Sequence, residues 1–166
     1  MLKEFDIKTL SFNPFERIGK DWCLITAGTE GSYNTMTASW GGVGILWGKE
    51  VATCYIRPQR YTKEFVDREE YFTLSFFPDG YRSALAFCGK YSGRDYDKAA
   101  ETGLTPLYTD GTTAFEEADL VLVCRKLYAQ PMSEDSFTDR EVLEQDYPNR
   151  DLHTIYIGEI VKAYKA

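Results

Sequence analysis

Near its start the chain carries three short segments that are rich in aromatic, β-branched and hydroxyl residues and are separated by glycines. The segments span residues 22–27, 34–40 and 51–57. The glycines around them are Gly28, Gly31, Gly41, Gly42, Gly44 and Gly48. Such composition favours β-strands, and closely spaced glycines favour tight turns and bulges. The pattern therefore predicts antiparallel hairpins instead of a βαβ unit.

The rest of the chain predicts further strands and a few short helices. We expect strands over residues 71–77, 119–129 and 152–164, with the second of them central because its first half is almost continuously apolar. The expected helices are one over 62–70 with Thr62 as its N-cap, one on the face of Tyr81, Ala84, Leu85 and Cys88 that ends at Gly89, and one from Asp95 to Gly103. Residues 132–151 are acidic and are predicted to be irregular. The predicted fold is mainly β, an antiparallel barrel or sandwich with a few short helices.

Size and charge limit the possible classes of function. With 166 residues the chain fits a single domain, residues 1–166. A formal net charge of −7 argues against a nucleic-acid partner, because phosphate backbones are bound by clustered Lys and Arg. No apolar run is typical of a signal peptide or long enough to span a bilayer, so we expect a cytoplasmic protein without a membrane partner. The expected reduced core thiols, none of them in a CxxC pair, are Cys23, Cys54, Cys88 and Cys124.

The segment from Asn34 to Trp40, which reads Asn-Thr-Met-Thr-Ala-Ser-Trp, combines an amide, three hydroxyls and a large ring. Alternation along a strand places its even-numbered residues on one face and Thr35, Thr37 and Ser39 on the other. This arrangement suits a ligand site. An edge strand whose hydroxyls face water explains the same residues equally well.

A second cluster, Arg57-Pro58-Gln59-Arg60-Tyr61-Thr62, places two arginines at the start of the helix predicted over 62–70. Free backbone N–H groups and the helix dipole attract phosphate there, and guanidinium groups bind phosphate bidentately. The alternative is a pair of surface arginines that neutralise the acidic residues of the helix, which are Glu64, Asp67, Glu69 and Glu70. Together with the hydroxyls and Trp40, the cluster indicates a ligand with a phosphate at one end and a ring system at the other, which is a flavin or a nucleotide.

Two further features carry less information. The loop Gly89–Asp95 contains two glycines, a hydroxyl and two cations, but it lacks the spacing of a P-loop. His153 is the only histidine, so no metal site is predicted. It either contacts a bound ring or is a hydrogen-bonded residue at the start of a strand.

Four segments, taken together and in this order, resemble the flavin reductase-like family. They are Asn34–Trp40, Ile56–Thr62 (Ile-Arg-Pro-Gln-Arg-Tyr-Thr), Ser92–Lys98 (Ser-Gly-Arg-Asp-Tyr-Asp-Lys) and His153–Ile160 (His-Thr-Ile-Tyr-Ile-Gly-Glu-Ile). The resemblance extends from about residue 21 to residue 161. It implies the FMN-binding split β-barrel fold, which the flavoredoxins share, and FMN as the cofactor in preference to FAD.

The resemblance also implies roles for the matching residues. Asn34 and Trp40 would flank the isoalloxazine ring. Thr37, Ser39 and the backbone around Met36 would bind the polar edge of the flavin or its ribityl-phosphate arm.

The remaining matches would hold the other end of the cofactor. Arg57, Arg60 and Thr62 would bind the phosphate, and Lys90 and Ser92 would close over the flavin. The family further implies a homodimer with the flavin near the subunit interface.

His153 would lie near the flavin ring or the nicotinamide pocket. No residue is expected to be catalytic in its own right, since flavin N5 accepts a hydride without a protein nucleophile. The resemblance thus implies an NAD(P)H-dependent flavin reductase that passes hydride from nicotinamide to flavin N5. An electron-transfer protein of flavoredoxin type, with tightly held FMN and a protein redox partner, and a non-catalytic flavin-binding protein are the alternatives.

Overall fold

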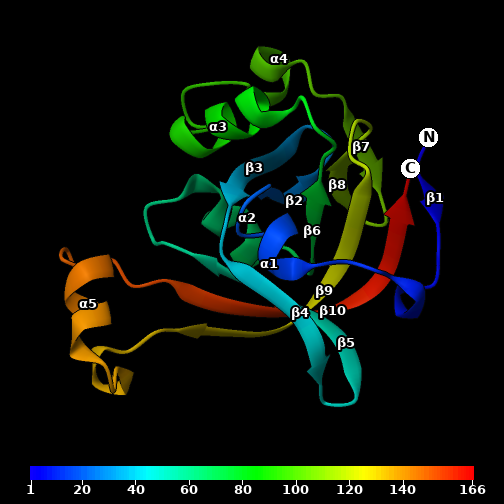
Figure 1. Ribbon diagram of the computed structural model, residues 1–166. Helices are drawn as coiled ribbons and strands as arrows, with labels where there is room; N and C mark the ends of the chain where they lie inside the picture. Colours follow the sequence, from blue (N-terminus) through cyan, green and yellow to red (C-terminus); the bar gives the residue numbers. More distant parts are fainter.

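An antiparallel sheet organises the computed structural model, which describes residues 1–166 (Figure 1). Its strands are β1 (Lys3–Glu4), β2 (Cys23–Thr29), β3 (Ser32–Ala38), β4 (Gly41–Leu46), β5 (Lys49–Ile56), β6 (Tyr71–Phe76), β9 (Leu120–Pro131) and β10 (Thr154–Lys165). They are ordered β3-β2-β6-β9-β10-β5-β4, and β1 pairs with the end of β10. A separate hairpin is formed by β7 (Pro106–Thr109) and β8 (Thr112–Phe115). The prediction of a mainly β, antiparallel fold is confirmed, with β9 at the centre of the sheet.

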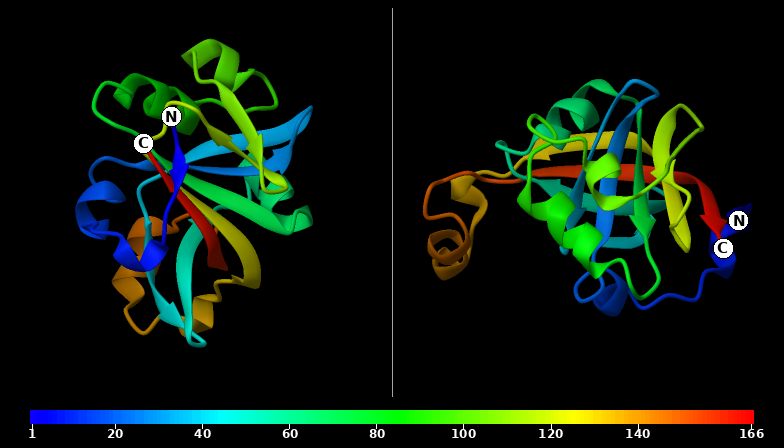
Figure 2. Two further views of the ribbon diagram at one scale, coloured as in Figure 1. Left: turned by 90° about the vertical axis from the view of Figure 1, so that its right-hand side faces the viewer. Right: turned by 90° about the horizontal axis from the view of Figure 1, so that it is seen from above.

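The helices are short and lie around the sheet (Figures 1 and 2). They are α1 (Pro14–Arg17), α2 (Tyr61–Arg68), α3 (Arg82–Lys90), α4 (Lys98–Thr102) and α5 (Arg140–Asp146), with 3-10 turns η1 (Ile7–Thr9) and η2 (Glu134–Ser136). No helix is both long and apolar enough to cross a membrane.

Alternate residues of β9 enter two different hydrophobic clusters, because successive side chains of a strand point to opposite faces of the sheet. Leu122 belongs to the cluster that also contains Phe65 and Val66 of α2. Val123 belongs to the cluster that contains Leu85 of α3 and Ala99 of α4. The sheet is therefore covered by α2 on one face and by α3 and α4 on the other, and β3 runs between these helices.

Residues 132–151 form an arm that extends away from the sheet, between the ends of β9 and β10 (Figures 1 and 2). The prediction of irregular structure here was wrong, since the arm contains η2 and α5. Asp139 caps α5 by accepting a hydrogen bond from the N–H of Glu141. Leu143 and Tyr147 are buried within the arm, so a small apolar core of its own stabilises the helix.

Several expected helix and strand ends also need correction. Gly89 does not end α3, because the helix continues to Lys90 and its C-cap is Tyr91. Asp97, not Asp95, caps α4, and Gly103 ends this helix in the left-handed conformation as expected. Gly41 begins β4, a strand where only turns were predicted.

Thr62 is not the N-cap of α2. The cap position is Arg60, whose side chain makes no capping hydrogen bond, and Thr62 lies one residue inside the helix. Its hydroxyl instead accepts a hydrogen bond of 2.9 Å from Nδ2 of Asn34, and this bond ties α2 to β3. The four cysteines are free and buried, which confirms their prediction as core thiols.

Candidate functional site

The end of β3 borders two adjoining hollows. The Trp40 hollow has a volume of about 240 Å³ and is lined by Met36, Thr37, Ala38, Ser39, Trp40, Tyr55, Arg57, Arg60 and His153. The Trp22 hollow has a volume of about 340 Å³ and is lined by Trp22, Thr37, Ser39, Arg60, Leu85, Ala86, Gly89 and Lys90. Because they share Thr37, Ser39 and Arg60, we treat them as one continuous cleft, the β3 cleft.

An aromatic wall forms one side of this cleft. The ring centroids of Trp40 and His153 are 5.3 Å apart, and those of Tyr55 and His153 are 6.5 Å apart. Trp40 is 48% exposed although it is large and apolar. The chain leaves β3 at Ala38, so the Trp40 ring lies beyond the strand and beside the start of β10. Such a wall offers a surface on which a flat ring can stack.

His153 is a neutral residue of this wall. Burial, together with the positive charge of Arg57, lowers its pKa to about 4. Its Nδ1 atom is 2.7 Å from the hydroxyl oxygen of Tyr147, which fixes the imidazole from the side of the arm. His153 is therefore an uncharged hydrogen-bonding group at neutral pH and not a cation.

Arg57 connects the cleft to the arm. One guanidinium nitrogen is 2.9 Å from a carboxylate oxygen of Asp151, and the other donates a hydrogen bond of 2.9 Å to the carbonyl of Asp146. The guanidinium carbon also lies 4.9 Å from the ring centroid of Tyr147. The charge of Arg57 thus has a carboxylate partner already.

Acidic residues of α2 do not pair with these arginines. Their partners are Arg94 for Glu64, Lys63 for Asp67, and Arg68 for the adjoining Glu69. The structure therefore gives Arg57 and Arg60 no role in neutralising these carboxylates.

Arg60 and Lys98 are cations without a carboxylate partner. Arg60 donates a hydrogen bond of 2.7 Å to the carbonyl of Gly89. Lys98 is 6% exposed, and its Nζ donates to the carbonyls of Thr35 and Cys88 at 2.7 and 2.8 Å. Burial lowers the pKa of Lys98 to about 8, and the charge of Arg60 contributes in the same direction. A cation without a carboxylate partner favours the binding of an anion.

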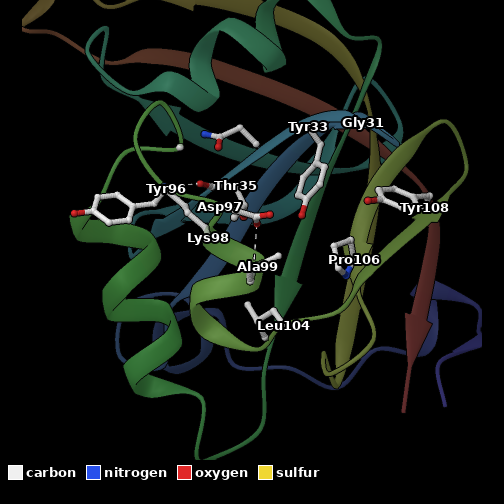
Figure 3. Close-up of a pocket in the computed structure, with 13 residues that line it drawn as sticks. Gly31, Tyr33, Thr35, Tyr96, Asp97, Lys98, Ala99, Leu104, Pro106 and Tyr108 are labelled. Atoms are coloured by element: carbon white, nitrogen blue, oxygen red, sulfur yellow. Dashed lines mark hydrogen bonds between the residues drawn. The ribbon is translucent and has the colours of Figure 1, made fainter.

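Lys98 also lines a third hollow, on the side of β3 that faces α4 and β7 (Figure 3). This Lys98 hollow has a volume of about 520 Å³. Tyr33 and Tyr108 lie side by side in it, with ring centroids 5.9 Å apart. Asn34 lines it too, and a Cβ at Gly93 would collide with the Asn34 amide, so only glycine lets the loop approach so closely.

The β3 cleft brings together most of the residues that the resemblance selects. Those that line it are Met36, Thr37, Ser39, Trp40, Arg57, Arg60, Lys90 and His153. Asn34 lines only the Lys98 hollow, Thr62 is buried against Asn34, and Ser92 accepts a hydrogen bond from the backbone N–H of Arg94. Sequence reasoning missed Tyr55 and Lys98.

The hydroxyls of Thr35 and Thr37 are hydrogen-bonded within the protein, although β3 is at the end of the strand order. Thr35 is buried and its hydroxyl donates to the carbonyl of Ile25. Thr37 donates to the carbonyl of Leu85 in α3. The alternative of an edge strand with hydroxyls facing water is therefore correct about the edge position. It is wrong about these hydroxyls, because α3 covers this face.

Comparison with known proteins identifies the family of this chain. A family model described as flavin reductase like domain matches residues 15–166. The chain belongs to the flavin reductase-like family. No curated protein matches its sequence.

Solved structures of this family have the same fold. The FMN-binding domain of a flavin reductase-like enzyme from Shewanella baltica is 15% identical, with a TM-score of 0.70 over 99% of this chain and 77% of that one. A flavoredoxin from Methanosarcina acetivorans is 21% identical, with a TM-score of 0.68 over 88% and 68%. Nitrilotriacetate monooxygenase component B from Bacillus cereus is 16% identical, with a TM-score of 0.68 over 95% and 82%. The fold is the split barrel of flavin reductase-like proteins, as the resemblance implied.

Proposed function

We propose that this flavin reductase-like protein binds FMN in the β3 cleft and is an NAD(P)H-dependent flavin oxidoreductase. The observation that carries the proposal is Arg60, a cation that lines the cleft beside the aromatic wall and has only a carbonyl partner. Lys98 also has only carbonyl partners, and it lines the Lys98 hollow on the other side of β3. A phosphate dianion is the partner that Arg60 lacks.

The two ends of the cleft suit the two ends of the cofactor. Arg60 provides charge for the phosphate, and Trp40, Tyr55 and His153 provide a wall for the ring. Ser39 lies between these groups and offers a hydroxyl to the polar parts of the flavin. We assign Arg57 chiefly to holding the arm, because Asp151 already neutralises it.

When bound, the flavin supplies the hydride chemistry at N5, and the chain supplies binding and orientation. His153 stays neutral, so it contributes a hydrogen bond near the ring without adding a positive charge. The Trp40 ring shields one side of the cleft from water while its exposed surface remains free for a second ring. These roles need no protein nucleophile and no general base.

A flavoredoxin-type electron carrier is the second candidate. The net charge of −7 favours docking with a basic redox partner, since complementary charge steers association. A carrier would hold FMN tightly and react poorly with NADH and NADPH. A reductase would turn over with one of them.

Replacing Trp40 by alanine is expected to change the emission of bound flavin. A flavin ring stacked against an indole is quenched, and removal of the indole also loses about 1 kcal/mol of stacking. Flavin fluorescence of the FMN-loaded variant should therefore rise, while Phe15→Ala, which removes an exposed aromatic ring outside the cleft, should leave it unchanged. Unaltered emission in the Trp40 variant would place the ring elsewhere.

We also propose a homodimer in which the arm reaches the partner. The arm packs around its own small core and carries an apolar hollow of about 410 Å³ next to Pro131 and Phe137. Strand β4 ends the strand order and carries the exposed side chains of Ile45 and Leu46. An unpaired strand edge and a projecting arm are typical of surfaces that pair with a second copy. Light scattering should give twice the 19.0 kDa of one chain, and the mass of one chain would refute the proposal.

A further inference from the structure

Tyr147 of the arm is fixed against the wall of the β3 cleft. It is 4% exposed, and its ring packs edge-on against Phe137 of the arm and against His153, with centroids 5.7 and 5.5 Å apart. The guanidinium carbon of Arg57 lies 4.9 Å from the centroid of the same ring. Contacts on several sides therefore hold the Tyr147 hydroxyl in one place.

The hydroxyl of Tyr147 has two neighbours that can accept its hydrogen. Nδ1 of His153 is 2.7 Å away and Sδ of Met132 is 3.5 Å away. Both rings are uncharged at neutral pH, because burial raises the pKa of Tyr147 and lowers that of His153 to about 4. A thioether sulfur is a weak acceptor, whereas an unprotonated imidazole nitrogen is a good one. The hydroxyl therefore donates the shorter bond, and Nδ1 accepts it.

This hydrogen bond decides where the imidazole carries its own hydrogen. A neutral imidazole has one N–H group, so an accepting Nδ1 leaves the hydrogen on Nε2. Nδ1 is the only ring nitrogen of His153 that has a hydrogen-bond partner in the protein. The ring is 7% exposed and lines the Trp40 hollow beside Trp40 and Tyr55. The polar atom that it offers to a ligand is therefore the Nε2–H donor.

We propose that Tyr147 is a positioning residue, which holds His153 as the tautomer whose Nε2–H donates a hydrogen bond into the β3 cleft. The inference rests on the proposed function, and it adds that the atom recognised by His153 is an acceptor, such as a carbonyl oxygen of the isoalloxazine. A donor at this place interacts more strongly with reduced flavin, whose oxygen atoms carry more negative charge. Tyr147 does not line the cleft, so it acts through His153.

The test is nitrogen-15 NMR of the imidazole in the flavin-free protein. His153 is the only histidine, so protein labelled at histidine and prepared without a histidine tag gives the signals of this one ring. We expect a protonated Nε2 and an unprotonated, hydrogen-bonded Nδ1 at neutral pH. In Tyr147→Phe the Nδ1 signal should shift toward that of a nitrogen without a hydrogen bond. Tyr55→Phe, which removes the hydroxyl of the other tyrosine beside His153, should leave the Nδ1 signal in place.

The ratio of the affinities for reduced and oxidised FMN is the second readout. Tyr147→Phe should lower this ratio roughly two- to twelvefold, which is the range that one net hydrogen bond gives. His153→Gln keeps an N–H donor near the place of Nε2, whereas the shorter amide of His153→Asn reaches only the place of Nδ1. The glutamine variant should therefore retain more of the ratio than the asparagine variant.

A hydrogen on Nδ1 in the unaltered protein would overturn the proposal, and so would an Nδ1 signal that Tyr147→Phe leaves in place. The same holds for a ratio of affinities that is unchanged in Tyr147→Phe. Protein that binds no FMN, read from visible absorbance, would instead refute the proposed function. The NMR spectra would still decide the tautomer in that case, because they are recorded without flavin.

Discussion

Replacing Arg60 by alanine is expected to weaken FMN binding by roughly 10- to 150-fold and to leave riboflavin binding nearly unchanged. The side chain lies in the β3 cleft, and its only hydrogen-bond partner is the carbonyl of Gly89. A hydrogen bond to a charged group is worth about 1.5–3 kcal/mol, and each 1.4 kcal/mol is tenfold in affinity. Riboflavin lacks the phosphate and so loses nothing. Fluorescence titration with both flavins measures the ratio.

Two control variants sharpen this measurement. Arg68→Ala removes an arginine that pairs with Glu69, outside the cleft, and should leave both affinities unchanged. Arg57→Ala removes the partner of Asp151, so it should disturb the arm and weaken both flavins to a similar degree. If FMN and riboflavin weaken equally in Arg60→Ala, the phosphate does not lie at this side chain.

In the flavin-free protein the contribution of Lys98 to stability should grow as the pH rises from about 8 to about 10.5. Burial holds the pKa of Lys98 near 8, against a value of 10.5 for an unburied lysine. Between these values the folded state has released the proton that the unfolded chain still binds, so stability increases with pH. At 1.36 kcal/mol per pH unit the gain is about 3 kcal/mol. Urea unfolding at several pH values measures it when the protein is compared with a variant that lacks the Lys98 amine.

The variant Lys98→Met isolates the contribution of Lys98 from those of the tyrosines and thiols, which titrate in a similar pH range. The difference in unfolding free energy between the two proteins should change by about 3 kcal/mol over this range, in favour of the unaltered protein at high pH. A pH-independent difference would mean that burial does not lower the pKa of Lys98.

Local sequence patterns were sufficient for the sheet and for much of the cleft. The aromatic and hydroxyl-rich segments became β2, β3 and β5, and the continuously apolar segment became the central β9. Arg60 and Trp40 were predicted from residue type and local sequence alone. An arginine before a helix indicates an anion site, and a large ring beside hydroxyls indicates a ligand site. Both line the β3 cleft.

Residues that depend on distant contacts were missed or misplaced. Lys98 and Thr35 are far apart in sequence, and only the packing of α4 on β3 shows that Lys98 is buried without a carboxylate. Thr62 has the residue type of an N-cap, but its hydroxyl is bound to Asn34 of another element. Tyr55 reads as an ordinary strand residue until β10 brings His153 beside it. Local propensity contains none of these contacts.

The central claim, that the β3 cleft holds a flavin which accepts hydride from a nicotinamide nucleotide, is tested by visible absorbance under anaerobic conditions. The purified protein, reconstituted with FMN and freed of excess, is titrated first with NADH and then with NADPH. We predict a yellow protein whose absorbance bleaches with one of the two donors, which would also name the donor. A yellow protein that neither donor bleaches would support the electron carrier instead. A colourless protein that retains no added FMN would contradict the account.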